Sequence, residues 1–377
     1  MMSQKKNAPA REPLFQLSKR ESISTGKAWM IRVLAILLGL VVCGIVAFIL
    51  SDKLRSGSKT IFDFYHSFFI KSSFTTPRKM WKFFKNMAVL QCIALAITPA
   101  FRMRFWNIGA EGQTLMGVWG AIAVAFYLGN STPAWLLLVL MFIASLLCGA
   151  VWALIPAIFK AKWNTNETLF TLMMNYVAAN VVSYFLVVWV PSGSSSLGKL
   201  EVGKLPAIVH DYFLIILIVL LLTVLLYIYL RHSKHGYEIS VVGESVRTAQ
   251  YSGMNVQKII IRTMLVSGLL CGLAGYLIGA GLDQSITTES IGGQGFTAIM
   301  VSWLAHFNPL VMLLTSGLIT LLNQGAAQIS QDFNVSGAIP DVIVGIILFF
   351  IIGSEFFINY KVKLHRKSNA AMKEGVK

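Results

Sequence analysis

Long apolar stretches separated by short polar segments run along almost the whole chain. An α-helix rises about 1.5 Å per residue, so about 20 apolar residues cross the roughly 30 Å hydrocarbon core of a bilayer. Because most of the stretches approach or exceed that length, we expect an all-α integral membrane protein with about ten transmembrane helices. The ten candidate spans are residues 30–50, 87–101, 109–128, 134–159, 169–190, 213–230, 259–281, 296–307, 310–322 and 339–358.

The stretch 296–307 is too short to cross a bilayer as a regular helix. Twelve residues extend only about 18 Å, against a core of about 30 Å. We therefore expect a half-helix here, or a helix that continues into the glycine-rich flank. If the segment re-enters without crossing, the number of spans changes.

Two glycine-rich breaks open short helices in different halves of the chain. The first reads GAEGQ at residues 109–113, and the second reads GGQG at residues 292–295. In a ten-span scheme the two breaks lie on opposite sides of the membrane, which is typical of an inverted repeat with broken helices, a transporter signature. The alternative is that glycine is simply frequent in membrane helices.

Composition and charge agree with a membrane protein. Only 13% of residues are charged, against roughly 25% in soluble domains, and the mean hydropathy is +0.68. The net charge of +16 lies mostly between the apolar stretches. This placement favours cytoplasmic loops held by Lys and Arg over nucleic-acid binding.

The two tails are basic, and an even number of spans puts both on the same side. We expect a cytoplasmic N-terminal tail over residues 1–28, a transmembrane domain over 29–360, and a cytoplasmic C-terminal tail over 361–377. The segment 51–86 then lies outside, although it carries eight Lys or Arg against two Asp. Two explanations compete: attraction to anionic membrane lipid, and docking of acidic patches on an extracellular partner.

Motifs for catalysis, nucleotide binding and metal binding are absent from the sequence. There is no G-x-x-x-x-G-K-[ST] phosphate-binding loop, no H-E-x-x-H and no G-x-S-x-G. The four cysteines lie singly in apolar stretches without metal-binding spacing. We expect no catalytic residue, no metal site and no cofactor in this chain.

Polar residues at membrane depth are the candidates for a solute path. Such groups are costly in hydrocarbon, so they usually face a cavity or cap a helix. For Asn166 and Glu167, N-capping of the following helix is the competing explanation, and the same applies to Glu111. The candidate path residues are Asn107, Glu111, Gln113, Asn166, Glu167, Asn175 and Gln294.

The polar segment 231–262 is long for a simple connection between two spans. Its middle, residues 244–251, has a helical pattern, and Gly253 is placed to end that helix. We expect it to face the cytoplasm and to form a docking surface through Gly243, Glu244, Tyr251 and Gly253. Gly243 would allow a close approach or a positive φ, and Glu244 would cap the N-terminus of the short helix. A solvated connector is the alternative.

Four strings resemble the permease subunits of the nucleoside and monosaccharide branch of ABC importers. They are FWNIGAEGQ at 105–113, TNETLFTLMMNY at 165–176, GYEISVVGE at 236–244 followed by YSGMN at 251–255, and GFTAIMV at 295–301 followed by NP at 308–309. Their order and spacing match from about residue 60 to the C-terminus, and the NIGAEGQ string is the most specific. The stretch 302–307, SWLAHF, is bulkier than the small pattern usual in that family.

This resemblance implies a bacterial cell-membrane permease that works with several partners. They are a cytoplasmic ABC ATPase that binds ATP and Mg²⁺, a second permease that we expect to be a different chain, and an extracellular solute-binding protein or lipoprotein. It makes residues 231–262 the coupling loop and a nucleoside the expected solute, with a monosaccharide or riboflavin-like molecule as the alternative. An ion-coupled secondary transporter, with Glu111 and Asp341 as its ionisable groups, is the competing class.

Overall fold

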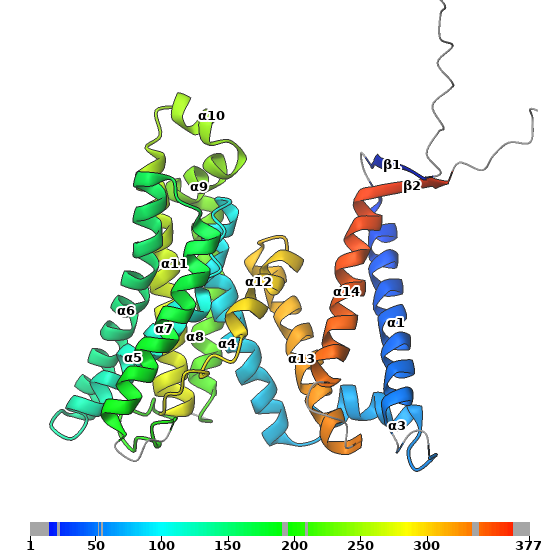
Figure 1. Cartoon of the computed structure of the whole chain (residues 1–377), viewed down its shortest axis with the longest axis horizontal. Helices are drawn as coiled ribbons and strands as arrows, with labels where there is room; N and C mark the ends of the chain where they lie inside the picture. Colours follow the sequence, from blue (N-terminus) through cyan, green and yellow to red (C-terminus); the bar gives the residue numbers. More distant parts are fainter. Residues whose placement is uncertain are drawn as a thin grey trace, which may run out of the picture. The chain divides into compact units, whose positions relative to one another are not determined.

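The computed structural model describes residues 15–20, 23–51, 53, 56–190, 195–207, 210–333 and 339–364. These residues are predominantly helical, with one two-stranded sheet, as Figure 1 shows. The all-α membrane fold expected from the sequence is confirmed. The chain divides into two compact units, one containing residues 1–68 and 326–377 and the other residues 69–325.

The first unit pairs the N-terminal and C-terminal helices. α1 (Thr25–Leu50) packs against α14 (Ile339–Asn359), and Arg32 forms an ion pair with Glu355 at 2.8 Å. The strands β1 (Phe15–Lys19) and β2 (Tyr360–Leu364) pair antiparallel, with Phe15 opposite Leu364. The N-terminal and C-terminal parts of the chain are therefore joined twice, by packing of α1 on α14 and by backbone hydrogen bonds between β1 and β2.

Two lysines of the basic segment 51–86 cap a helix end within the first unit. Lys53 Nζ and Lys59 Nζ donate to the backbone carbonyl of Asp332, at 2.8 and 2.9 Å, in the last turn of α13 (Pro309–Phe333). Cations are favoured at a helix C-terminus, where carbonyl groups lack intrahelical partners. Lys53 and Lys59 thus have a structural role within this chain, in addition to the two roles inferred from charge alone. Arg55 lies outside the described residues.

The short helix α3 (Ile61–His66) and the π-helical turn η1 (Ser67–Lys71) follow this basic start. Thr60 and Asp63 form a reciprocal capping box at the start of α3. Residues 61–70, which are rich in aromatic side chains, are therefore helical.

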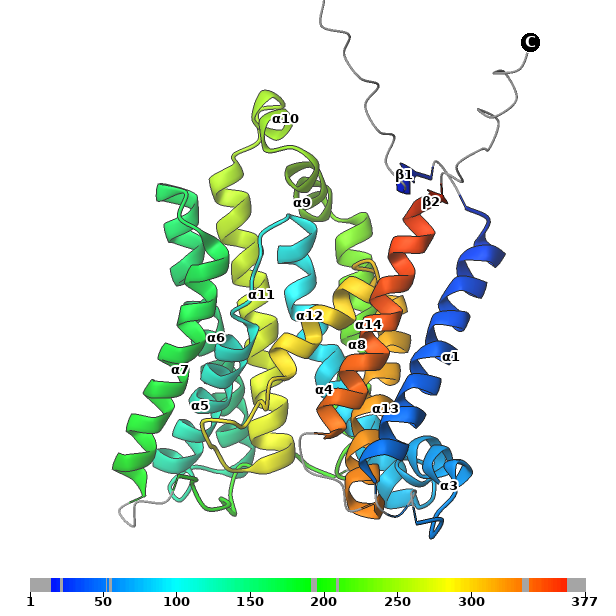
Figure 2. The ribbon, with the colours of Figure 1, turned by 45° about the vertical axis from the view of Figure 1, so that its right-hand side comes forward.

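The second unit is a helical bundle with α11 at its centre. α11 packs against α4, α5 and α6, and α7 and α8 cover α5 and α4 (Figures 1 and 2). The bundle contains α4 (Pro77–Arg102), α5 (Ala110–Leu128), α6 (Ala134–Trp163), α7 (Glu167–Trp189), α8 (Phe213–His232), α11 (Val256–Ile278) with η2 (Gly279–Asp283), α12 (Gln294–Leu304) and most of α13.

Small residues allow α6 and α11 to approach closely. A Cβ added to Gly272 would lie 2.4 Å from the carbonyl oxygen of Ser145, and one added to Gly149 would lie 2.6 Å from that of Gly268. The Ser145 hydroxyl donates to the Gly272 carbonyl at 2.6 Å. Close backbone approach through small residues and interhelical hydrogen bonds are the interactions that hold membrane helices together.

Eight helices in the described part of the chain are long and apolar enough to span a membrane. They are α1, α4, α6, α7, α8, α11, α13 and α14, so the expected count of ten is approximate. The two expected spans outside this set are α5 and α12. α12 has only 11 residues, about 16 Å, which confirms the half-helix expected near 296–307. His306 and Phe307 then adopt positive φ angles of 49° and 57° and turn the chain into α13.

The two glycine-rich breaks have reciprocal surroundings. α4 leads through the first break into α5, and α11 leads through the second into α12. α4 packs on α12, α11 packs on α5, and α4 and α11 pack on each other. These contacts bring the two broken helices together, and the inverted orientation of the two halves stays a prediction.

The short helices α9 (Lys234–Glu244) and α10 (Val246–Tyr251) connect α8 to α11. In both views they lie at one end of the bundle, and α10 extends beyond the ends of the long helices (Figures 1 and 2). The expected helix over 244–251 is confirmed, although it begins at Val246.

Candidate solute path and coupling site

The first break is held by a pair of facing amides. Asn107 Nδ2 donates to Gln113 Oε1 at 3.1 Å, and Gln113 Nε2 donates to Asn107 Oδ1 at 3.0 Å. Asn107 Oδ1 also accepts from the Gly109 backbone, and Asn107 Nδ2 reaches Ser267 on α11. Both amides are buried. These bonds fix the entry of the chain into α5.

α7 supports the same break from the other side. Asn175 Oδ1 accepts from the Gly112 N–H at 2.9 Å, and Asn175 Nδ2 donates to the Ile108 carbonyl at 3.0 Å. Thr171 Oγ1 accepts from the Ile108 N–H at 3.2 Å. Backbone groups at a break inside a membrane need such partners, because hydrocarbon offers none. Asn107, Gln113 and Asn175 are thus brought together, and their role toward a solute stays a prediction.

Glu111 lies in the first turn of α5 but hydrogen-bonds to α12. Its Oε1 accepts from the Gly293 N–H at 2.8 Å, and its Oε2 accepts from the Gly295 N–H at 2.7 Å. A carboxylate at a helix N-terminus satisfies free N–H groups and interacts favourably with the helix dipole. Of the two roles weighed for Glu111, capping is present, but the capped helix is in the opposite half of the chain.

Asn166 and Glu167 begin α7. The Asn166 side chain accepts from the Leu169 N–H at 3.1 Å, which confirms the expected N-cap. Glu167 forms an ion pair with Lys160 at 2.9 Å, across the turn between α6 and α7. Asn166 and Glu167 lie at the N-terminal end of α7, more than two helical turns from Asn175 on the same helix.

Gln294, another path candidate, lines a polar cavity. The cavity has a volume of about 230 Å³ and lies between α4, α12 and α13. Its polar lining also includes Asn86, Thr297, Thr320, Asn323 and Gln324. Among these, only Gln294 belongs to the residues selected as path candidates from the sequence.

Serines cap both helices of the α9–α10 segment. Ser233 accepts from the Gly236 N–H at 2.9 Å, and Ser245 accepts from the Thr248 N–H at 3.2 Å. The expectation that Glu244 caps the second helix is wrong, because Glu244 is the last residue of α9 and the side chain of Ser245 already occupies the cap. Gly253 has φ +76° after α10, as expected of a residue that ends a helix.

Gly243 packs directly on the end of α4. A Cβ on Gly243 would lie 2.1 Å from the carbonyl oxygen of Arg102, the last residue of that helix. The close approach expected of this glycine is therefore present. The C-terminal end of α9 is held against α4, which leads into the first break.

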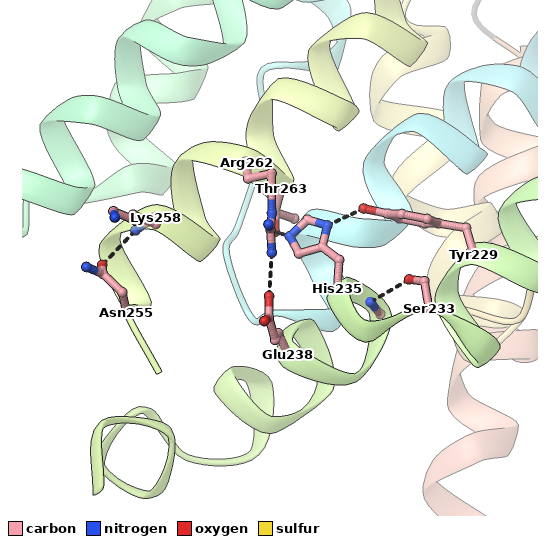
Figure 3. Close-up of polar contacts among 9 residues, drawn as sticks. Tyr229, Ser233, His235, Glu238, Asn255, Lys258, Arg262 and Thr263 are labelled. Carbon is pink, nitrogen blue, oxygen red and sulfur yellow. Dashed lines mark hydrogen bonds and ion pairs between the residues drawn. The ribbon is translucent and has the colours of Figure 1, made fainter. Parts of the chain in front are cut away.

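His235 joins the α9–α10 segment to the two helices that flank it (Figure 3). Its ring contacts the Tyr229 hydroxyl on α8 through Nδ1 and the Thr263 hydroxyl on α11, at 3.3 Å, through Nε2. Glu238, one turn later on α9, forms an ion pair with Arg262 of α11. Side chains of α9 therefore connect it to both neighbouring long helices.

The environment of His235 favours the neutral imidazole. Burial lowers the pKa of His235, and the positive charge of Arg262 lowers it further. The carboxylate of Glu238 and a hydrogen bond with the backbone of Ile259 act in the opposite direction. The net shift is downward from 6.5, so both ring contacts belong to the uncharged form near neutral pH.

A second cavity, of about 520 Å³, adjoins this segment. It is lined from α6 by Lys160, from α7 by Glu167, and from the α9–α10 segment by Gly243 and Glu244. Glu167 and Glu244, assigned to different roles from the sequence, thus line one cavity. Tyr251 at the end of α10 is 92% exposed, so its side chain is available to a partner.

Comparison with known proteins identifies the family. Residues 82–352 match the family described as the permease component of branched-chain amino acid transport systems. The chain belongs to this family of ABC transporter permeases. The resemblance inferred from the sequence strings is confirmed.

Three relatives illustrate the similarity. The chain is 31% identical over 269 residues to the guanosine ABC transporter permease protein NupP of Bacillus subtilis, covering 69% of this chain and 77% of NupP. It is 27% identical to the glucose ABC transporter permease protein TsgB13 of Haloferax volcanii, covering 95% of this chain and 96% of that protein. It is 27% identical to the nucleoside ABC transporter permease protein NupB of Lactococcus lactis, covering 83% and 90%.

The side-chain contacts that hold α9 against α8 and α11 could not be predicted from the sequence. His235, Glu238, Arg262 and Thr263 lie inside or next to the segment expected to be a coupling loop, but their pairing depends on how α9 folds back between α8 and α11. The local signal is Ser233, which lies two residues before His235 and shortly after the apolar span 213–230. That signal marks a helix boundary and does not identify the partners.

Proposed function

We propose that this permease is one of two different membrane subunits of an ABC importer that translocates a nucleoside. The main support is the 31% identity to a guanosine permease, together with the similarity to a nucleoside permease over 83% of the chain. The neutral polar groups near the breaks suit an uncharged solute that donates and accepts hydrogen bonds.

Pairs of relatives support a second, different permease. In Bacillus subtilis the chain is similar to the guanosine permease proteins NupP and NupQ, at 31% and 24% identity. In Lactococcus lactis it is similar to the nucleoside permease proteins NupB and NupC, at 27% and 23%. In each pair this chain is more similar to one member, NupP or NupB. A second permease related to NupQ or NupC would then form the other half of the solute path.

The energy for transport comes, in this proposal, from a separate cytoplasmic ATPase that binds ATP and Mg²⁺. The chain itself has no phosphate-binding loop. The exposed helix α10 and the contacts of His235 and Glu238 with α8 and α11 support docking of the ATPase at this end of the bundle. In this proposal a movement of α9 is transmitted to α8 and α11 through these contacts, and to α4 through Gly243. Alternating access then follows as ATP closes the ATPase and the two permeases rock.

We place the protein in a bacterial plasma membrane with both tails in the cytoplasm, and an extracellular binding protein or lipoprotein delivers the solute. The basic tails support this orientation.

Uptake of radiolabelled guanosine by cells with and without the gene tests the proposal. We expect the deletion to abolish saturable uptake, and ATP depletion to stop it while an ionophore that collapses ion gradients does not. Uptake that follows the ion gradient and persists without ATP would instead favour a secondary transporter.

A monosaccharide is the second candidate solute. The similarity to a glucose permease extends over 95% of this chain, further than that to NupP. Competition separates the two: excess unlabelled guanosine suppresses uptake through a nucleoside importer, and excess glucose suppresses uptake through a monosaccharide importer.

A further inference from the structure

The polar cavity between α4, α12 and α13 lies at mid-height of the helices that form it. Asn86 and Leu90 are near the middle of the 26-residue α4, and Thr320 and Gln324 are near the middle of the 25-residue α13. Its third wall is the start of the broken helix α12. Transporter solute sites lie near the bilayer midplane, beside discontinuous helices.

The wall of this cavity is neutral and rich in amides. None of the described residues that line it is charged, and its polar side chains combine donors with acceptors. They are Asn86, Gln294, Thr297, Thr320, Asn323 and Gln324. Such a wall fits an uncharged solute with hydroxyl or amide edges, and it disfavours an anion or a cation, which would lose its hydration without gaining a countercharge.

Two of these amides have unused hydrogen-bonding capacity. Gln294 Oε1 and Gln324 Nε2 are buried and find no hydrogen-bond partner among the described residues. One is an acceptor and the other a donor. Buried polar atoms without partners are costly, so a ligand that supplies a donor and an acceptor gains affinity by pairing them.

Neighbouring groups hold these two glutamines in place. The Ser73 hydroxyl donates to Gln324 Oε1 at 3.0 Å, which orients that amide. Glu111 binds the N–H groups on either side of Gln294, those of Gly293 and Gly295, and so fixes the backbone that carries it. The two unpaired atoms are therefore attached to restrained positions, as expected of a binding site.

We propose that this amide pocket is a solute subsite that binds hydroxyl groups of a neutral nucleoside or sugar during translocation. Gln294 and Gln324 are its binding residues, and Glu111 is a positioning residue for Gln294. The volume of about 230 Å³ is below the roughly 300–1,000 Å³ of pockets that enclose a whole small ligand, so the pocket holds one part of the solute, such as its sugar ring. This inference rests on the proposed function.

The experiment compares guanosine with its 2′-deoxy and 3′-deoxy analogues in cells that carry Gln294→Leu, Gln324→Leu or the wild-type protein. We expect the wild type to prefer guanosine to at least one analogue, and a wild type without such a preference would overturn the subsite. We expect each variant to lose guanosine uptake by about fivefold but uptake of that analogue by much less, so that the preference falls. Because the binding protein is the same in all cells, the change in preference reports on the permease.

Asn180→Ala, on the exposed face of α7, is the control and keeps the wild-type preference. If a leucine variant does not accumulate in the membrane, Gln→Met at the same position replaces it. An unchanged preference in variants at both positions overturns the subsite. Wild-type cells that take up neither guanosine nor glucose through this permease overturn the proposed function instead, so the two failures are distinguishable.

Discussion

Glu111 Oε2 accepts a hydrogen bond from the Gly295 N–H at 2.7 Å, so a residue in the first turn of α5 caps α12, 184 residues further along the chain. The contact is close: a Cβ on Gly295 would lie 2.5 Å from the backbone nitrogen of Glu111. The two glycine-rich breaks therefore meet, and the start of each broken helix constrains the other.

Replacing Glu111 with Ala should reduce solute uptake by about tenfold and lower the thermal stability of the detergent-solubilised protein. The change removes the acceptor for two N–H groups at the start of α12, a loss on the order of 0.5–2 kcal/mol for a helix cap. Glu111→Gln keeps the size but has only one acceptor oxygen, so an intermediate effect is expected. Uptake assays at matched membrane levels check this; wild-type uptake and stability in Glu111→Ala would show that the cap is dispensable.

Replacing Gly243 with Ala should uncouple ATP hydrolysis from uptake or weaken assembly with the ATPase. The new Cβ would lie 2.1 Å from the Arg102 carbonyl oxygen, so α9 has to move away from the end of α4. Gly198→Ala is the matched control, because nothing lies within 4 Å of the added Cβ and no change is expected. The measurements are co-purification of the ATPase and solute-stimulated hydrolysis in the assembled complex. Wild-type values for both in Gly243→Ala would contradict a coupling role for this contact.

Replacing Tyr251 with Ala should weaken co-purification of the ATPase while leaving the permease folded. The side chain is 92% exposed at the end of α10, so its removal costs little packing within this chain. Aromatic side chains that a partner buries commonly contribute 1 kcal/mol or more, about a fivefold change in affinity. Tyr184→Ala on α7, where the side chain is 66% exposed, is the control. Equal co-purification for both variants would show that α10 does not dock through Tyr251.

The stability of the folded protein should fall as the pH drops below about 6.5, in part because of His235. The folded-state pKa of His235 is lowered from 6.5, so between these two values the unfolded chain binds a proton that the folded chain does not. The free energy of unfolding then decreases with decreasing pH, whereas above 6.5 this residue contributes no pH dependence. Thermal unfolding of wild type and His235→Gln, at a series of pH values, isolates the effect. A glutamine can hydrogen-bond to both hydroxyls but does not titrate, so the loss on acidification should be smaller; identical pH profiles would contradict this assignment.

The apolar pattern and the glycine breaks predicted the local features well. A run of apolar residues specifies a membrane helix almost independently of its neighbours, because every backbone hydrogen bond is made within the segment. The half-helix near 296–307, the N-cap at Asn166 and the helix end at Gly253 could also be predicted, because each depends on a few neighbouring residues. The one cap assigned wrongly, at Glu244, differs by a single position from the observed Ser245, because both residue types are favoured near the start of a helix.

The amino-acid pattern alone is enough to identify the class of protein. It shows membrane spans, two breaks, neutral polar residues beside them, and a helical segment between two spans in a chain without an ATP-binding motif. Which partners these residues have depends on how the helices pack in three dimensions. The sequence suggested that the Glu111 carboxylate caps its own helix, but its oxygens accept hydrogen bonds from the start of α12. Gln294 and Gln324 are 30 positions apart, and the pocket that they share exists only because α4 packs beside α12. Helix periodicity extends over a few residues, whereas these contacts depend on how whole helices pack, which no local pattern encodes.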